Sequence, residues 1–345
     1  MRKFSTFLST FFSTLLTPLL FVISTMSCGG GASNPPTSPT PPIIISAPTL
    51  SADQLVFDSD RTGNHEIFVM KANGTELKQL TNDSKYENWW ARISPNRKTI
   101  LFYRSPAGKP ENYTEASLWL MNVDGTGVTQ LRAKGADGWT LQGHAEWSPD
   151  GNKIAMFGSA GSALEIFVTD ALGKNPVQYT RRGGINTDVS WSPDGSKLLF
   201  NGCAISPCVP ANYEIFVMAA SAFSPATQLT NNGLADYDPY FSPDGTKIAW
   251  LVNVDPTKFP IGDVRLGAWA IRIANADGSN PAYLINDGNI NSKPAWSLDG
   301  RTIFFHRMEL DPFVEGKFGV FRIDITGSGL TRLTNVGYNN EHPSN

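Results

Sequence analysis

A short phrase that returns six times along the chain constrains the fold more than any other feature. It reads WSPDG at 147–151 and 191–195, FSPDG at 241–245 and WSLDG at 296–300, with degraded copies at 92–96 and 50–53. Each copy precedes two short apolar runs, a small turn and a closing phrase such as QLTN. Repetition at a period of about 40 to 50 residues is typical of propellers, in which each repeat forms one blade. The sequence therefore predicts an all-β fold, a six-bladed β-propeller of four-stranded antiparallel blades.

Local signals agree with the repeat. The apolar runs are rich in Val, Ile, Phe and Trp and are bounded by Gly, Pro, Asn or Asp, which is the pattern of strands. Asn-Gly at 73–74 and Asp-Gly at 124–125 supply the positive φ that two-residue hairpin turns need. The predicted blades span 50–82, 88–133, 142–180, 186–231, 236–286 and 291–335.

The two ends of the repeat region suggest how the ring closes. The C-terminal NEHPSN (340–345) is in register with DYDPYF (236–241), so it reads as the start of a seventh copy. We expect this C-terminal strand to complete the first blade, because a paired strand removes an exposed sheet edge. The alternative is that residues 47–50 supply the innermost strand of that blade and the C-terminus is loose.

The N-terminus has the pattern of a targeting segment. Arg2 and Lys3 precede an apolar run from Phe4 to Ile23, followed by small residues and Cys28. This order is typical of a secretory signal peptide over residues 1–27. The alternative is a transmembrane anchor, which the interruption by Pro18 and several hydroxyl residues disfavours.

Cys28 and the residues after it suggest a lipid anchor. The Gly- and Pro-rich stretch GGGASNPPTSPTPP follows Cys28, and we interpret residues 28–45 as a tether to a propeller over 46–345. A Cys at the cleavage point resembles that of a bacterial lipoprotein, which implies lipidation of Cys28. Of the residues before it, only Ser27 fits that pattern well, so plain secretion is the alternative. By resemblance, Gly29 favours the outer membrane, and we expect a periplasmic or cell-surface protein.

The remaining cysteines indicate a disulfide, and the net charge bears on the class of partner. Cys203 and Cys208 are five residues apart in one loop, and in an oxidising compartment we expect them to form a disulfide. The formal net charge is −3 and no basic cluster occurs, so a nucleic-acid partner is not expected.

The repeat also resembles a known family. The stretch SDRTGNHEIFVMKANGTELKQLTN (59–82), together with the repeated WSPDG, resembles the TolB-like β-propellers, also called WD40-like Asp-Pro repeats. TolB carries an α/β domain before its propeller, where this sequence has only the tether, so TolB's role in the Tol–Pal envelope system does not transfer directly. Propellers of prolyl-oligopeptidase-like enzymes share these repeats, but their hydrolase domain needs a Gly-x-Ser-x-Gly motif that this sequence lacks.

Long insertions indicate which end of the propeller binds. Strands alternate in direction, so the connections between second and third strands lie at the same end as the starts of the innermost strands. That end holds the insertions 105–116, 253–267 and 307–317 and the loop with the two cysteines. Insertions on one face of a repeat array usually mark its binding face.

Two ring positions at this end are candidate ligand-binding positions. The first ring consists of Asn88, Gln142, Asn186, Asp236, Asn291 and Asn340. The second ring, two residues on, consists of Trp90, His144, Asp188, Asp238, Lys293 and His342. The first ring could instead satisfy backbone groups at the strand entrances. The second ring varies in chemistry, as a site for a polar ligand, a peptide terminus or a metal would.

The other aromatic and imidazole side chains have plainer interpretations. Trp147, Trp191 and Trp296, with Phe241, recur at one position of the repeat and are expected to pack between blades. His65 and His306 are expected at the surface.

These observations favour a non-enzymatic binding module. Its expected partner is an envelope protein or peptide, with a carbohydrate as another possibility, and it would contact the membrane only through the lipid. No cofactor is expected. The alternative is a metal-dependent polysaccharide lyase or hydrolase with Gln142, His144 and His342 in the central channel, since some propeller lyases with similar repeats hold a divalent metal through His and Gln.

Overall fold

The structure is a computed structural model, and it describes residues 48–203, 208–209, 212–255, 268–309 and 316–345. The chain divides into two units, Met1–Ile45 and Ser46–Asn345, and the strands belong to the second. The predicted signal peptide, Cys28 and the tether lie outside the described residues, as do parts of three predicted insertions. Within the described residues, no helix is long and apolar enough to cross a membrane.

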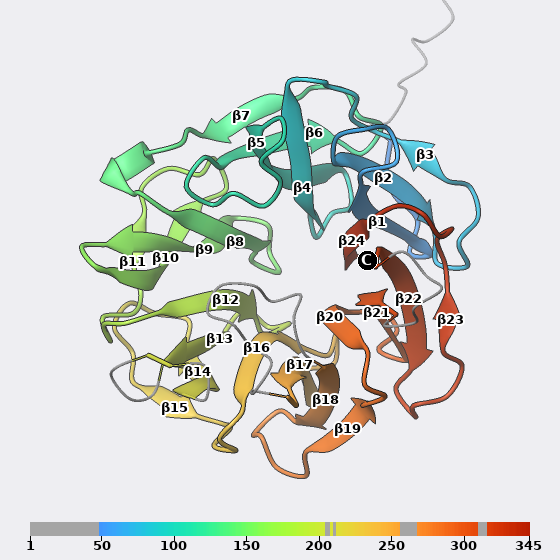
Figure 1. The fold of residues 1–345 in the computed structure, drawn as a ribbon. Coiled ribbons are helices and arrows are strands. Elements are labelled where there is room, and N and C mark those ends of the chain that lie inside the picture. Colours follow the sequence, from blue (N-terminus) through green and yellow to red (C-terminus); the bar gives the residue numbers. More distant parts are fainter. Residues whose placement is uncertain (1–47, 204–207, 210–211, 256–267, 310–315) are drawn as a thin grey trace, which may run out of the picture. The chain divides into compact units, whose positions relative to one another are not determined.

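Antiparallel strands make up the second unit (Figure 1). One sheet holds β24 (Asn340–Ser344), β1 (Gln54–Ser59), β2 (Glu66–Lys71) and β3 (Lys78–Gln79). The next holds β4 (Tyr86–Ile93), β5 (Thr99–Pro106), β6 (Ser117–Asn122) and β7 (Thr129–Arg132). A third holds β8 (Gln142–Trp147), β9 (Lys153–Ala160), β10 (Ala163–Asp170) and β11 (Val177–Gln178), and a short 3-10 turn, η1 (Ala136–Gly138), precedes it.

The C-terminal half continues the pattern. A fourth sheet holds β12 (Asn186–Trp191), β13 (Lys197–Cys203), β14 (Tyr213–Ala219) and β15 (Ala226–Gln228). The last sheet has eight strands: β16 (Ala235–Phe241), β17 (Lys247–Asn253), β18 (Trp269–Asn275), β19 (Ala282–Ile285), β20 (Ile290–Trp296), β21 (Thr302–Met308), β22 (Phe318–Asp324) and β23 (Thr331–Arg332). The sheets surround a common axis, which makes the fold an all-β propeller (Figure 1).

The sheet count differs from the predicted six separate blades. There are four sheets of four strands and one of eight. The eight-stranded sheet arises because Trp269 of β18 pairs in parallel with Ile290 of β20. This single pair joins two halves whose other pairings are antiparallel.

The first and last repeats are in contact. β24 pairs antiparallel with β1, with Ser59 opposite Asn340 and Asp58 opposite Glu341. The hairpin turn after β2 also packs against the last repeat, because a Cβ on Gly74 would lie 2.6 Å from the Leu333 carbonyl oxygen. Gly74 has a φ of +85°, so this turn needs glycine both for its backbone and for its close approach.

The recurring phrase shapes a tight turn between the first two strands of a sheet. At 147–151 the Ser148 hydroxyl accepts a hydrogen bond from the Lys153 amide at 2.9 Å and donates to Asp150 Oδ1 at 2.6 Å. Asp150 Oδ1 also accepts from the Asn152 amide at 3.0 Å. The Ser and Asp of the phrase therefore satisfy backbone donors that a turn of this shape leaves unpaired.

The aromatic residue of the phrase packs between sheets, as predicted. Trp191 belongs to a cluster with side chains of β9 and β10 in the preceding sheet, and its Nε1 donates to the Glu146 carbonyl at 3.3 Å. Trp296 likewise donates to the Tyr240 carbonyl at 3.3 Å. Phe241 packs on side chains of β13 and β14 in the same way. Burying one large apolar group per repeat links neighbouring sheets into a continuous core.

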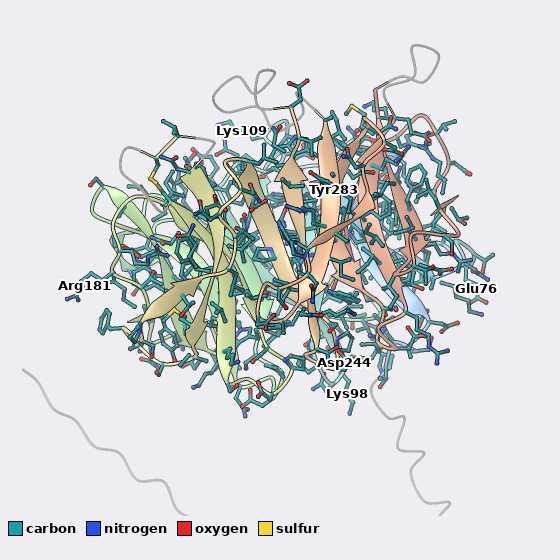
Figure 2. The ribbon with its side chains drawn as sticks, turned by 90° about the horizontal axis from the view of Figure 1, so that it is seen from below. Glu76, Lys98, Lys109, Arg181, Asp244 and Tyr283 are labelled. Atoms are coloured by element: carbon teal, nitrogen blue, oxygen red, sulfur yellow. A yellow bond between two sulfur atoms is a disulfide. The ribbon has the colours of Figure 1, made fainter. Side chains whose placement is uncertain are left out.

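The two ends of the propeller differ. Figure 2 shows Lys109, from the 105–116 insertion, at one end of the molecule and Asp244 and Lys98, from phrase turns, at the opposite end. The insertion and the tight turns therefore lie at opposite ends, as the alternation of strands requires.

Candidate functional site

Each innermost strand breaks its pairing register at the same point. The breaks lie between Trp89 and Arg92 in β4 and between Gly143 and Glu146 in β8, with equivalents in β12, β16, β20 and at β24. An extra residue in one strand is a β-bulge, which redirects a side chain out of the regular alternation. The bulges place one side chain per innermost strand toward the propeller axis.

The redirected residues are the six members of the second ring, and all have a left-handed backbone. Their φ values are 58° for Trp90, 51° for His144, 49° for Asp188, 49° for Asp238, 54° for Lys293 and 50° for His342. Such values are uncommon for residues other than glycine and cost on the order of 1–3 kcal/mol each. The surrounding sheets must therefore hold this conformation at every one of these positions.

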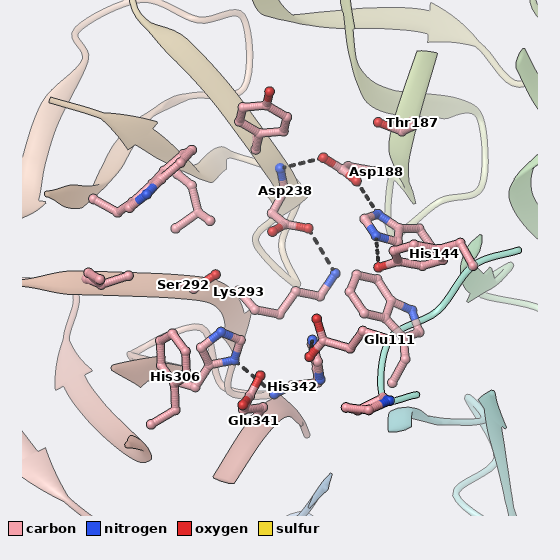
Figure 3. A pocket seen from close by; sticks show the side chains of 18 of the residues that line it. Glu111, His144, Thr187, Asp188, Asp238, Ser292, Lys293, His306, Glu341 and His342 are labelled. Carbon is pink, nitrogen blue, oxygen red and sulfur yellow. Dashed lines mark hydrogen bonds and ion pairs between the residues drawn. The ribbon is translucent and has the colours of Figure 1, made fainter. Parts of the chain in front are cut away.

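All six second-ring side chains line one cavity of about 560 Å³, which we call the axial cavity (Figure 3). Glu111 and Tyr113 of the 105–116 insertion also line it, so the cavity faces the end that holds the insertions. Trp269 and Phe318 add aromatic surface. The cavity thus combines aromatic faces with both signs of charge.

The first ring lies elsewhere. Its six members, Asn88, Gln142, Asn186, Asp236, Asn291 and Asn340, are buried and do not line the axial cavity. The Gln142 amide donates to the carbonyl oxygens of Ala116 and Ala133 at 3.0 Å each, and Asn291 donates to the Trp269 carbonyl at 2.8 Å. These side chains hold neighbouring strand ends together, which agrees with the alternative interpretation of this ring as structural.

One side of the axial cavity is built around His144. Its Nδ1 pairs with Asp188 Oδ1, and its Nε2 is 2.7 Å from the Tyr113 hydroxyl. Its ring stacks on Trp90 with centroids 4.0 Å apart. Burial alone would raise the pKa of Asp188, but the charge of His144 and its hydrogen bond, with the charge of Lys293, lower it. Asp188 is therefore an ionised, internally paired carboxylate.

Lys293 is the buried cation of the site, with 2% of its side chain exposed. Its Nζ is 3.2 Å from Asp238 Oδ1, hydrogen-bonds to the Tyr240 hydroxyl and lies 3.5 Å from the centroid of the Trp90 ring. Burial lowers the pKa of Lys293 to about 8, although the carboxylate of Asp238 opposes the shift. A cation over an aromatic face is stabilised by the ring quadrupole.

A buried carboxylate, Asp58, organises the adjoining part of the site at β1 and β24. Asp58 of β1 lies 2.9 Å from His342 Nδ1 and 3.0 Å from His65 Nδ1, and it accepts from the Trp90 amide at 3.2 Å. Burial would raise the pKa of Asp58, but the charge and hydrogen bond of His342, with those of His65, hold it far below its usual range. Burial would lower the pKa of His65, but its hydrogen bond to Asp58 and the charge of Asp58 raise it.

The prediction that His65 and His306 lie at the surface is wrong. They are 7% and 4% exposed, and both line the axial cavity. His306 Nδ1 accepts from the His342 amide at 2.9 Å, and burial, with the nearby His342, lowers the pKa of His306 far below its usual value. Both histidines stand at strand ends, and strand ends at this end of the propeller converge on the axis instead of facing solvent.

A third cluster consists of two carboxylates and one imidazole. Glu111, Glu341 and His342 each offer one ligand atom, and these atoms lie within 4.8 Å of one another. His342 Nε2 is 3.6 Å from Glu111 Oε1. Burial and the neighbouring Glu111 raise the pKa of Glu341 well above its usual value.

Sequence reasoning missed several members of the site. Asp58 is a charged residue inside the apolar run LVFDS, and that placement was the signal for a buried, partnered carboxylate. Glu341 adjoins the second-ring residue His342. Glu111 and Tyr113 belong to an insertion predicted at the binding end, but no pattern in the insertion shows which of its side chains turn inward.

The structure does not assemble the predicted lyase-type metal set. Gln142 does not line the axial cavity, and His144 and His342 belong to separate clusters. The ring of Trp90 lies near both imidazoles, with centroids 4.0 Å from His144 and 5.1 Å from His342. Gln142, His144 and His342 therefore do not converge on one ion.

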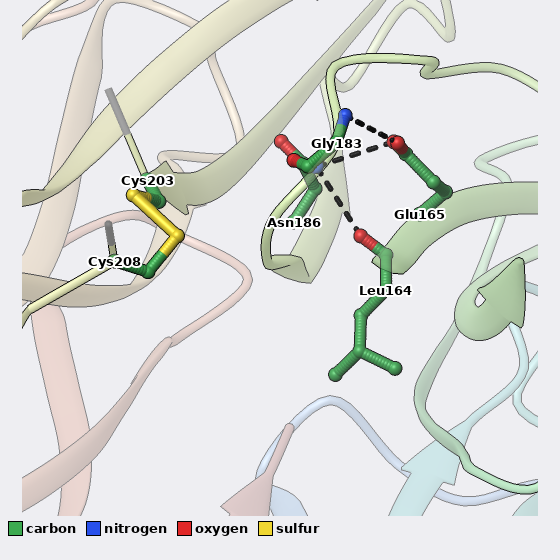
Figure 4. Close-up of a disulfide and its surroundings, with 6 residues drawn as sticks. All are labelled: Leu164, Glu165, Gly183, Asn186, Cys203 and Cys208. Atoms are coloured by element: carbon green, nitrogen blue, oxygen red, sulfur yellow. Dashed lines mark hydrogen bonds between the residues drawn. A yellow bond between two sulfur atoms is a disulfide. The ribbon is translucent and has the colours of Figure 1, made fainter. Parts of the chain in front are cut away.

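The two loop cysteines are bonded. Cys203 and Cys208 form a disulfide with Cα atoms 5.4 Å apart (Figure 4). A Cβ on Gly184 would lie 2.8 Å from Cys208 Sγ, so the bridge packs directly on the segment that enters β12. The disulfide ties the end of β13 near that strand entrance.

Comparison with known proteins supports the fold. No protein-family model matches the sequence. An uncharacterized protein of Agrobacterium fabrum is 28% identical over 103 residues, which cover 29% of this chain and 34% of that protein. TolB of Acinetobacter baumannii superposes with a TM-score of 0.66 at 16% identity, over 85% of this chain and 66% of that one. A putative TolB of Agrobacterium tumefaciens gives a TM-score of 0.56 at 20% identity, over 81% and 88%.

The fold is that of a TolB-like β-propeller. At these identities the likeness describes the backbone architecture alone. The match also spans only about a third of the Agrobacterium fabrum protein and just under two thirds of the Acinetobacter TolB chain. What this chain binds must therefore be argued from its own side chains.

Proposed function

We propose that this protein is an exported, lipid-anchored β-propeller that acts as a non-enzymatic binding module of the cell envelope. It would engage a protein segment or a polar ligand through the axial cavity and the insertions around it. The observation that carries this proposal is the ring of six left-handed residues, of four chemical types, whose side chains all line one cavity.

The backbone strain supports a role in recognition. A purely architectural bulge would be served by glycine at each position, which adopts positive φ without cost. Here Trp, His, Asp and Lys occupy these positions instead. Strained non-glycine residues that converge on a cavity are typical of binding sites, where their side chains serve a ligand.

The charge arrangement suits the binding of a charged or polar group. His144 is paired with Asp188, and Lys293 with Asp238. Each pair places a donor and an acceptor side by side, which matches the hydrogen-bonding groups of a peptide terminus or a sugar. Aromatic faces such as Trp90 then provide the contact area that anchors a ligand.

The proposal also includes export of the protein and its attachment to a membrane by a lipid. We infer that residues 1–27 are removed, that Cys28 receives the lipid, and that residues 28–45 connect it to the propeller. Growth with a clickable palmitate analogue should label the wild-type chain and leave a Cys28→Ala variant unlabelled. Label retained in that variant would contradict the anchor.

We also infer that the ring consists of six blades closed by the C-terminal strand. The two halves of the eight-stranded sheet each repeat the four-strand pattern of the other sheets, and β24 lies beside β1. Removal of residues 340–345 should then lower the melting temperature markedly by exposing the edge of β1. An unchanged melting temperature would contradict closure by this strand.

A ligand screen tests the binding role. Thermal-shift measurements on the purified full-length chain, in mild detergent, should find a peptide or oligosaccharide that raises the melting temperature. Tyr113→Ala, in the axial cavity, should abolish the shift. The matched control Tyr283→Ala removes an exposed tyrosine on the outer strand β19 and should preserve it. Equal shifts in both variants would refute the cavity as the binding site.

A further inference from the structure

We propose that Glu111, Glu341 and His342 form a binding site for one divalent transition-metal ion at the wall of the axial cavity. This inference is independent of the proposed ligand-binding role. The three ligand atoms lie within 4.8 Å of one another, and the residues come from the 105–116 insertion and from β24. Both segments meet at the cavity, so an ion would connect the insertion to the last strand.

The orientation of His342 is the first independent support. Its Nδ1 is 2.9 Å from Asp58, a fully buried carboxylate that can only accept hydrogen bonds while ionised. Nδ1 therefore donates to Asp58, and Nε2, on the far side of the ring, faces Glu111. A carboxylate that orients a histidine through its far nitrogen is the usual second layer of a metal site.

The convergence of His342 Nε2 with two carboxylates is the second support. His342 is 5% exposed, and its Nε2 lies 3.6 Å from Glu111 Oε1, beyond hydrogen-bond reach. Glu341 is 8% exposed, and its side chain faces another carboxylate, that of Glu111. A positive ion placed between the two carboxylates and the imidazole would relieve the repulsion between Glu111 and Glu341.

The neighbouring acidic cluster differs in this respect. His144, Asp188 and Asp238 also lie within 4.8 Å of one another. However, Lys293 Nζ is 3.2 Å from Asp238, so a lysine already supplies a positive charge to this cluster. A metal ion there would meet the charge of Lys293. We therefore place the metal at Glu111, Glu341 and His342, where no lysine is paired with the carboxylates in the described residues.

The donor set indicates the class of metal. Two carboxylates and an imidazole suit Zn²⁺, Mn²⁺ or Co²⁺, whereas Ca²⁺ and Mg²⁺ prefer oxygen ligands alone. Ligand atoms at about 2.1 Å from one ion lie about 3 to 4 Å apart. The 3.6 Å between His342 and Glu111 already fits this range, and the partly exposed Glu111 can adjust to bring in the third atom.

Metal titration tests the site directly. The purified full-length chain, in mild detergent, with no metal-binding tag and stripped with a chelator, should bind one equivalent of Zn²⁺ by calorimetry. It should also give a Co²⁺ visible spectrum of a nitrogen–oxygen ligand set. Glu111→Gln and Glu341→Gln should each weaken binding at least about tenfold. The matched control Glu115→Gln, in the same insertion but paired with Lys134, should bind as the wild type does.

Three outcomes would overturn the proposal. The first is the absence of binding by the wild type at 1 mM metal, which would mean that protons alone neutralise the cluster. The second is unchanged affinity in Glu111→Gln, a change at a partly exposed loop position that should not disturb folding. The third is loss of the metal in Asp188→Asn with retention in Glu341→Gln, which would place the ion in the other cluster.

Discussion

Replacement of Asp236 by Asn should make this protein more stable at neutral and alkaline pH. Asp236 is fully buried in β16, where it accepts from Trp250 Nε1 at 3.0 Å and faces the carboxylate of Glu214. In two of the other sheets, an Asn at the same position donates to a buried glutamate. There Asn88 donates to Glu66 at 2.8 Å and Asn186 donates to Glu165 at 3.2 Å. The amide introduced by Asp236→Asn should make the same bond to Glu214, so an amide–carboxylate hydrogen bond replaces a repulsive pair.

The magnitude follows from the pKa of Asp236, which burial and the charge of Glu214 raise from 3.8 to about 7. Each pKa unit corresponds to about 1.4 kcal/mol. Between pH 3.8 and 7 the folded state keeps a proton that the unfolded state has lost, so the free energy of unfolding falls as pH rises through this window. The total loss is on the order of 4 kcal/mol by about pH 8, and the Asn variant should not suffer it.

Urea unfolding followed by tryptophan fluorescence at pH 4 and pH 8 measures the effect. The variant's advantage over the wild type should grow by several kcal/mol between the two pH values. Asp244→Asn, at an exposed phrase turn, is the matched control and should show no gain at pH 8. The same stability difference between Asp236→Asn and wild type at both pH values would refute the reasoning.

Three further predictions concern the turns and the axial cavity. Hydrogen bonds from the Ser192 hydroxyl and from the Ser196 amide lower the pKa of Asp194 to about 2. Asp194→Asn should therefore reduce stability at pH 7. That reduction should vanish as pH falls toward 2, because protonation removes the same stabilisation from the wild type, and acid unfolding curves check this. Tryptophan fluorescence should show a transition near pH 8, because Lys293 loses its charge above the Trp90 ring. The Lys293→Met variant should lack this transition. A transition that persists in the variant would mean that another group causes it. Gly74→Ala should lower the free energy of unfolding in urea by more than about 1 kcal/mol. Position 74 has a positive φ, and the new methyl group would clash with the Leu333 carbonyl of the last repeat. Unchanged stability would show that the neighbouring backbone can move to accept the methyl group.

Most of the fold could be predicted from the amino-acid sequence because the sequence repeats. Each phrase turn depends on its own Ser and Asp, and each strand on its own apolar run, so local chemistry specifies these elements within a few residues. The recurring Trp191 and Trp296 were assigned correctly to the space between sheets, because a large apolar group placed once per repeat has few other places to go. The eight-stranded sheet was not readable, since it depends on one pair between Trp269 and Ile290.

Only part of the candidate site could be predicted from the sequence. The second ring was found because its six positions follow from alignment on the phrase, and their varied chemistry indicated binding. The sequence left the role of the first ring open between ligand binding and a structural role at the strand entrances. A bulge at the strand entrance directs one set to the axial cavity and leaves the other set in the wall.

The sequence by itself therefore determined the repeat, its turns, the packing aromatics and the positions that face the axis. Tertiary structure alone decided which charges meet there. Asp58 and His342 lie 284 residues apart in the chain and are hydrogen-bonded across the paired first and last strands. Glu111 reaches the same place from an insertion in the second repeat. Such contacts depend on the path of the backbone around the axis, and no local pattern of residues encodes that path.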